Sequence, residues 1–160
     1  MRFNRSPADS QWITNLTDPD RYIFGHLDQT TVALTGRVNY TMTPNLSLQL
    51  YGEPFVSGGQ YTSFKELVDG RNPDYGLRYR PVSNALDLID DPNFNVKSFR
   101  TTNVLRWEYK PGSTLFVVWQ QARENDAVPG DFRFGRDFRD IFHGAPKNVF
   151  LVKLAYWINY

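Results

Sequence analysis

The sequence predicts an all-β fold built from antiparallel, up-and-down strands. Several stretches alternate apolar and polar residues with the two-residue period of a strand. Aromatic residues make up 16% of the chain, and many Thr, Asn and Gln accompany them inside these stretches. No window holds the roughly eighteen apolar residues that a membrane-spanning helix needs. The chain is therefore expected to form a sheet rather than a helical bundle.

Composition narrows the function classes. The 160 residues suffice for one unit with a core, and 18 basic and 17 acidic side chains give a net charge of +1. This balance argues against a nucleic-acid partner. The absence of Cys excludes disulfides and thiolate metal sites. The first ten residues hold no apolar secretory signal. A mean hydropathy of -0.50 is typical of soluble proteins and equally of transmembrane β-strands, which alternate in polarity.

The first predicted hairpin follows a short strand over Ser10–Leu16 that ends at the polar turn "TDPDR". The stretch Thr30–Met42 alternates along its whole length, and "TPN" at 43–45 turns the chain into a second strand that begins at Leu46. One face of this hairpin is apolar and the other polar. The apolar face carries Val32, Leu34, Gly36, Val38, Tyr40, Met42, Leu46, Leu48 and Leu50.

A second hairpin repeats this plan. "FRTTNVLRWEYK" and "TLFVVWQQAR" alternate on either side of the turn "KPGS" at 110–113. Phe116 and Val118 place apolar side chains on the otherwise polar face. The polar face of the whole chain is expected to carry Arg37, Arg106, Glu108 and Lys153.

The chain closes on "NVFLVKLAYWINY", another alternating strand. Its wholly apolar face carries Phe150, Val152, Leu154, Tyr156, Ile158 and Tyr160. Taken alone, this segment fits the edge of a soluble β-sandwich as well as a membrane strand.

Connection lengths favour the membrane alternative. About six antiparallel strands are expected, joined by the short turns 43–45 and 110–113 and by long loops over 52–97 and 124–147. Short turns at one end and long loops at the other are typical of outer-membrane barrels. The loops are expected to hold two short helices on the barrel mouth or folded into it. One has Ser63 and Glu66 at capping-box spacing before Gly70, and the other aligns Phe134, Phe138, Ile141 and Phe142 on one stripe.

Outward-facing aromatics are predicted to form two belts. Bilayers place such rings at the headgroup level, whereas a sandwich core collects them in the middle of its strands. One belt is expected near the short turns, and the other near the long loops. The first contains Tyr40, Trp107, Tyr109, Tyr156 and Tyr160, and the second Phe99, Trp119 and Phe150. The predicted fold is therefore a transmembrane β-barrel in a bacterial outer membrane.

The closing strand resembles the C-terminal signal that the outer-membrane barrel-assembly machinery recognises, through Val152, Leu154, Tyr156, Ile158 and Tyr160. The segments that begin "YIFGHLDQ", "NVLRWEYK" and "NVFLVKLA" further resemble the C-terminal part of domain-of-unknown-function family 5916, a family of outer-membrane barrels. This resemblance implies an upstream carbohydrate-binding module of the family-nine type and a chain that is a terminal piece of a longer protein. About six strands leave open edges in lipid, so we expect completion by upstream strands of the same protein or by other copies.

Candidate chemistry is sparse. Glu66, Asp69, Asp74, Asp137, Asp140 and His143 lie in the predicted loops without the spacing of a metal signature. Solvated loop charge is the expected interpretation, and no catalytic residue, cofactor or metal is predicted. Arg37, Arg106, Glu108 and Lys153 are expected to line the lumen, either biasing passage toward anions or forming an ion-pair network. Phe55, Tyr61, Tyr75 and Tyr79 are candidates for stacking on sugar rings.

Three function classes follow. The first is a membrane-embedded barrel segment, an anchor or pore linked to surface carbohydrate binding or uptake, with the lipid bilayer and the assembly machinery as partners. The second is a soluble β-sandwich binding module. The third is an outer-membrane hydrolase, which requires a nucleophile and a base in one place.

Overall fold

The computed structural model describes residues 1–17, 19–126 and 130–158, which form one open antiparallel sheet. The order of its strands is β1-β2-β4-β6-β7-β8, and β3 and β5 each pair with β4. The all-β, antiparallel class predicted from the sequence is confirmed. In the described ranges the strands are β1 (Arg2–Leu16), β2 (Arg21–Ala33), β3 (Gly36–Thr43), β4 (Leu46–Leu67), β5 (Tyr79–Pro81), β6 (Phe94–Lys110), β7 (Ser113–Asn125) and β8 (Lys147–Ala155). The helices there are α1 (Phe134–Asp140) and the 3-10 turns η1 (Tyr75–Arg78), η2 (Ala85–Asp87) and η3 (Ile141–His143).

Both predicted short turns are present. Pro44 and Asn45 connect β3 to β4, and the Asn45 amide donates to the Thr43 hydroxyl at 3.3 Å. Pro111 and Gly112 connect β6 to β7, and Gly112 has a φ of 75°. Proline followed by a residue with positive φ is the pattern of a type II turn, in which glycine carries no steric penalty.

β2 and β3 together form a single arm beside β4. Ala33 lies opposite Phe55 and Gly36 opposite Gly52, without a shift of register between them. The Leu34 amide bridges the interruption by donating to the carbonyl of Pro54 at 3.0 Å. The predicted strand Thr30–Met42 is therefore found, divided between two assigned strands.

The loop predicted over 52–97 is much shorter in the structure. β4 continues to Leu67 and β6 starts at Phe94, so the helix expected from Ser63 and Glu66 is wrong. Glu66 instead pairs with Arg80 of β5 and with Arg21 at the start of β2. Strand pairing and long-range ion pairs outweigh the local capping signal, which is a weak preference. The loop between β7 and β8 agrees with the predicted range 124–147.

The two ends of the chain also differ from expectation. β1 begins at Arg2, eight residues before the predicted strand at Ser10, because its first half pairs with β2 up to Ala33. β8 ends at Ala155, earlier than expected, and its pairing with β7 ends at Thr114. Tyr160 lies outside the described residues.

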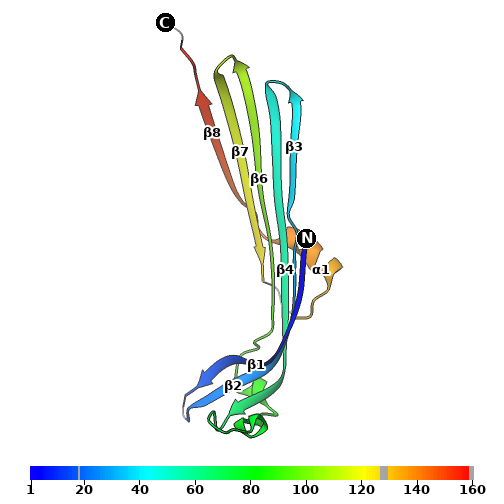
Figure 1. Cartoon of the computed structure of the whole chain (residues 1–160), viewed down its shortest axis with the longest axis vertical. Helices are drawn as coiled ribbons and strands as arrows, with labels where there is room; N and C mark the ends of the chain where they lie inside the picture. Colours follow the sequence, from blue (N-terminus) through cyan, green and yellow to red (C-terminus); the bar gives the residue numbers. More distant parts are fainter. Residues whose placement is uncertain (18, 127–129, 159–160) are drawn as a thin grey trace.

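The molecule is long and narrow (Figure 1), with β3, β7, β8 and the adjoining halves of β4 and β6 at one end and β1 and β2 toward the other. Its small apolar core lies in the half that contains β2 and the far part of β4. None of the helices in the described ranges is long and apolar enough to cross a membrane. The buried apolar residues of the described part of the chain are Ile23, Leu27, Val32, Val56, Ala85 and, in η3, Ile141.

Candidate functional site

The candidate site is an extended surface, the apolar face of the sheet half formed by β3, β4, β6, β7 and β8. Residues directly opposite one another on paired strands form cross-strand rows, and their side chains point to the same face. Three consecutive rows on this face are apolar apart from Thr43 and Asn103, and we name them the apolar rows. They are Thr43, Leu46, Trp107, Leu115 and Leu154; then Tyr40, Leu48, Leu105, Val117 and Val152; then Val38, Leu50, Asn103, Trp119 and Phe150.

Solvent exposure of these rows is high. Tyr40 on β3 is 60% exposed, and Phe150 and Val152 on β8 are 70% and 66% exposed. Large exposed apolar patches of this kind mark a protein or membrane contact.

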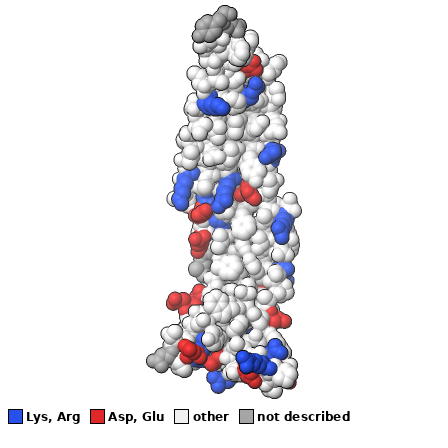
Figure 2. Space-filling view, turned by 60° about the vertical axis from the view of Figure 1, so that its left-hand side comes forward, with Lys and Arg blue, Asp and Glu red and all other residues white. Residues whose placement is uncertain are grey.

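The opposite face is mixed and largely polar. Figure 2 shows charged side chains of both signs along the visible surface, most densely from its middle to its lower end. Arg37, Arg106, Glu108 and Lys153 all lie on it, as the alternation predicts. Arg106 pairs with Glu108 at 3.2 Å between nitrogen and oxygen. Phe116 and Val118 interrupt the polarity, as expected from the sequence, and Leu151 and Val149 lie beside them on β8. Two of the cross-strand rows on this polar face are Thr41, Ser47, Arg106, Phe116 and Lys153, and Asn39, Gln49, Val104, Val118 and Leu151.

The aromatics predicted to form belts fall at several levels along the strands. Trp107 and Tyr109 contact one another beside the short turns, with ring centroids 6.0 Å apart. Trp119 stacks on Phe150 at 6.2 Å, four residues further along the sheet, which corresponds to about 13 Å of strand. Tyr40 occupies the row between them.

A polar row borders the apolar rows on the side of the long loops. Asn148 accepts a hydrogen bond from the Trp119 indole at 3.0 Å and another from the Gln121 amide at 2.9 Å. The Trp119 ring thus faces the apolar rows through its stacked body and the polar row through its N–H. Tryptophan side chains at a membrane interface have the same orientation, with the apolar ring toward the hydrocarbon and the N–H toward polar groups. The row comprises Gly36, Gly52, Thr101, Gln121 and Asn148.

The residues of the predicted assembly signal lie at the free edge of the sheet. Val152 and Leu154 belong to β8, whereas Tyr156 and Ile158 follow its last strand residue. All four are at least 60% exposed. The fifth member, Tyr160, is outside the described residues. The Trp157 amide donates to the Ser113 hydroxyl at 3.0 Å, which holds this segment against the start of β7.

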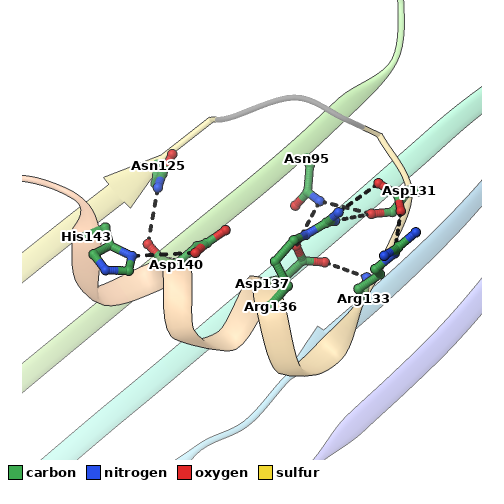
Figure 3. Close-up of polar contacts among 8 residues, drawn as sticks. All are labelled: Asn95, Asn125, Asp131, Arg133, Arg136, Asp137, Asp140 and His143. Atoms are coloured by element: carbon green, nitrogen blue, oxygen red, sulfur yellow. Dashed lines mark hydrogen bonds and ion pairs between the residues drawn. The ribbon is translucent and has the colours of Figure 1, made fainter.

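Sequence reasoning missed the buried carboxylate of Asp137. This side chain is 0% exposed and accepts hydrogen bonds from the Asn95 amide at 3.2 Å, the Arg133 backbone at 2.7 Å and the Arg136 guanidinium at 2.8 Å. Figure 3 shows α1 lying across the strands with this cluster beneath it. Only the helical stripe signalled α1 in the sequence, and nothing there indicated Asn95 as a partner.

Arg136 binds a second carboxylate on the same loop. Its Nη1 atom is 2.9 Å from Asp131 Oδ1. This hydrogen bond lowers the pKa of Asp131, and the bonds to Asp137 and Asp131 raise the pKa of Arg136. The pair therefore remains ionised over the neutral range and ties the loop to α1.

The other predicted loop charges are dispersed among local contacts. The carboxylate of Asp74 caps η1 through the Gly76 amide at 2.9 Å, and Asp69 accepts from the Arg71 amide at 3.1 Å. The Nδ1 atom of His143 lies 3.5 Å from Oδ1 of Asp140. Among the described residues, no group of three or more His, Cys, Asp and Glu is placed to hold a metal ion.

The candidate sugar-stacking aromatics are only partly brought together. Tyr75 and Tyr79 have ring centroids 5.4 Å apart, and the Lys65 ammonium lies 4.7 Å from the Tyr79 ring. Phe55 lines a separate shallow depression on the polar face. Tyr61 lies against Gly25 of β2.

The family model described as "Domain of unknown function (DUF5916)" matches residues 1–160. No curated protein and no solved structure matches the chain. Because the family model spans the whole chain, the protein belongs to the DUF5916 family.

Proposed function

We propose that this chain is a membrane-embedded segment of a β-barrel in the outer membrane, which serves as an anchor or a pore. The observation that carries the proposal is the alignment of the three apolar rows on one exposed face of five adjoining strands. Lipid-facing barrel surfaces need a continuous apolar band, and strand registers that slip by one residue destroy it. The polar opposite face then lines the barrel interior. The proposed link to surface carbohydrate rests on the module that the family resemblance implies.

A soluble sandwich fits these observations less well. In a sandwich, a second sheet packs on the apolar face and buries it at a spacing of about 10 Å. Here the side chains of the rows remain exposed on β3 and β8. Trp119 also directs its N–H to a polar row at the margin of the apolar rows, a position that suits a membrane interface.

Strand direction limits how the sheet is completed. β3 and β8 carry the free edges of the apolar half among the described residues, and the chain of antiparallel pairings makes them run in the same direction. All-antiparallel closure between them therefore needs an odd number of added strands. Copies with the same membrane orientation would bring β8 beside β3 in parallel, which transmembrane barrels of this class avoid. We therefore favour further strands of the same polypeptide as the completing element.

Single cysteines on adjacent residues test the proposal. The chain contains no Cys, so L48C on the apolar rows and Q49C on the opposite face each add one thiol to this segment. The full-length protein, labelled there with a fluorophore, is reconstituted in vesicles that carry nitroxide groups on the acyl chains. We expect strong quenching of the label at position 48 and much weaker quenching at position 49.

The control is iodide added to the aqueous phase, which reaches labels exposed to water. A label at position 48 that is untouched by the lipid-borne quencher would overturn the membrane proposal. If it were also shielded from iodide, the sandwich alternative would be supported instead.

A further inference from the structure

The segment formed by α1 and η3 lies on the same face of the sheet as the apolar rows. Phe142 packs on Phe99 with ring centroids 5.5 Å apart, and Arg123 donates to the carbonyl of Phe142 at 2.7 Å. Phe99 and Arg123 face each other across β6 and β7, in continuous register with Trp107 and Leu115 of the apolar rows. The helix expected at the barrel mouth or inside it therefore lies on the apolar side.

Further contacts fix this placement. Asn125 at the end of β7 donates to the carbonyl of Asp140 at 3.1 Å, and Asn95 of β6 donates to Asp137. A Cβ atom added at Gly58 would lie 3.0 Å from the carbonyl oxygen of Gly130, so the loop leading to α1 runs against β4 on this face. Val56 is buried there.

The segment lies one polar row beyond the end of the apolar rows. The polar row of Thr101 and Gln121 separates the Trp119 level from the Phe99 level. Phe99 is four residues beyond Asn103 of the last apolar row, or about 13 Å along the strand. In Figure 1, α1 lies beside the middle of the long strands, next to the half that carries the apolar rows. This level corresponds to the headgroup region if the rows face hydrocarbon.

The exposed side chains of the segment combine aromatic rings with a cation. Phe134 and Phe142 are 48% and 47% exposed, although their helix packs on the sheet. Arg139 is exposed as well and makes no ion pair with any described residue. Lys147 lies opposite Ala122 and therefore on the other face, with Lys153. Short amphipathic segments that rest on membranes have this composition, with rings among the upper acyl chains and cations at lipid phosphates.

We propose that the α1–η3 segment is a lipid-headgroup contact that binds the phosphates of anionic lipids through Arg139, with Phe134 and Phe142 inserted beside it. The inference rests on the membrane function proposed above, because it requires the apolar rows to face hydrocarbon. It adds a contact surface outside the strands and gives the long loop between β7 and β8 a position on the outside of the barrel.

Depth-resolved quenching tests the placement. The full-length protein carries a fluorophore at F142C or V152C and is reconstituted with nitroxide either on the lipid headgroup or deep in the acyl chains. We expect the headgroup probe to quench position 142 and the deep probe to quench position 152. Quenching at 152 without quenching at 142 would overturn this inference and leave the barrel proposal intact. Absence of quenching at both positions would overturn both proposals.

Charge preference is measured with the same label at position 142, in vesicles of phosphatidylcholine with or without phosphatidylglycerol. The variant R139Q should lose the stronger headgroup quenching that phosphatidylglycerol produces, since a cation near an anionic surface changes the local equilibrium about fivefold. K110Q at the opposite end of the sheet is the matched control and should leave this quenching unchanged. An equal response of the control and R139Q would contradict the assignment of Arg139.

Discussion

At the scale of single residues, Asp137 has the largest consequence for the loop that covers the sheet. Its carboxylate receives donors from a distant strand, from the backbone and from Arg136. A fully buried carboxylate is stable only when such partners compensate for its lost hydration. α1 is therefore attached to β6 by a polar cluster as well as by the rings of Phe99 and Phe142.

We expect Asp137→Asn to loosen α1. The amide replaces a charged acceptor with a neutral group that presents an extra donor toward Asn95, Arg133 and Arg136, at a cost of about 2 kcal/mol of local stability. Hydrogen exchange of the amides in 133–143 measures this change. Asp126→Asn is the control, because Asp126 is exposed and directly follows the last residue of β7. Equal exchange in the two variants would show that the Asp137 cluster does not hold the helix.

At the scale of elements, the hairpin of β6 and β7 depends on its turn. Gly112 adopts a φ of 75°, where a side chain introduces strain. A Cβ atom at this position would also lie 3.1 Å from Cβ of Trp157. The turn thus couples the conformation of the hairpin to the segment that follows β8.

Gly112→Ala should destabilise the protein by about 1–2 kcal/mol, because the residue is forced into the left-handed region. Gly135→Ala provides a matched control in α1, since nothing lies within 4 Å of its added Cβ. That control should be neutral or more stable by up to about 1 kcal/mol, as expected for alanine in a helix. Denaturant unfolding of the reconstituted protein gives both values, and a larger loss for Gly135→Ala would refute the argument.

At the scale of the whole molecule, the two faces of the sheet predict opposite responses to charge. Val152 lies in the middle apolar row, and its neighbour Leu151 points to the opposite face. Both belong to the same edge strand, so local strand effects are shared. The difference between the stability changes caused by lysine at positions 152 and 151 therefore reports the environment of each face.

Val152→Lys is expected to reduce the folding free energy in bilayers by about 2–4 kcal/mol, the cost of a lysine near the bilayer midplane. Leu151→Lys should change it little, because this position lies beside Val118 on the opposite face, which lines the interior in the proposed barrel. Equilibrium folding into vesicles measures the two values under the same conditions. A larger loss at position 151 would mean that the faces are assigned the wrong way round.

The sequence alone determined which residues share a face in the alternating strands, where the two short turns lie and that a helix forms at Phe134. These features follow from local properties: side chains alternate along any extended backbone, proline and glycine favour turns, and apolar residues repeat with the helical period. The family was also identifiable from local segments and is confirmed over the whole chain.

Only the tertiary structure decided the length of β4 and β6, the extension of β1 and the position of α1. Strand pairing supplies backbone hydrogen bonds that no local pattern encodes, which is why Ser63 and Glu66 join a strand instead of a helix. Burial of Asp137 likewise depends on Asn95, which is 42 residues away in the sequence. A charge in a polar loop is solvated by default, and it becomes part of a buried cluster only when folding brings its partners within hydrogen-bonding distance.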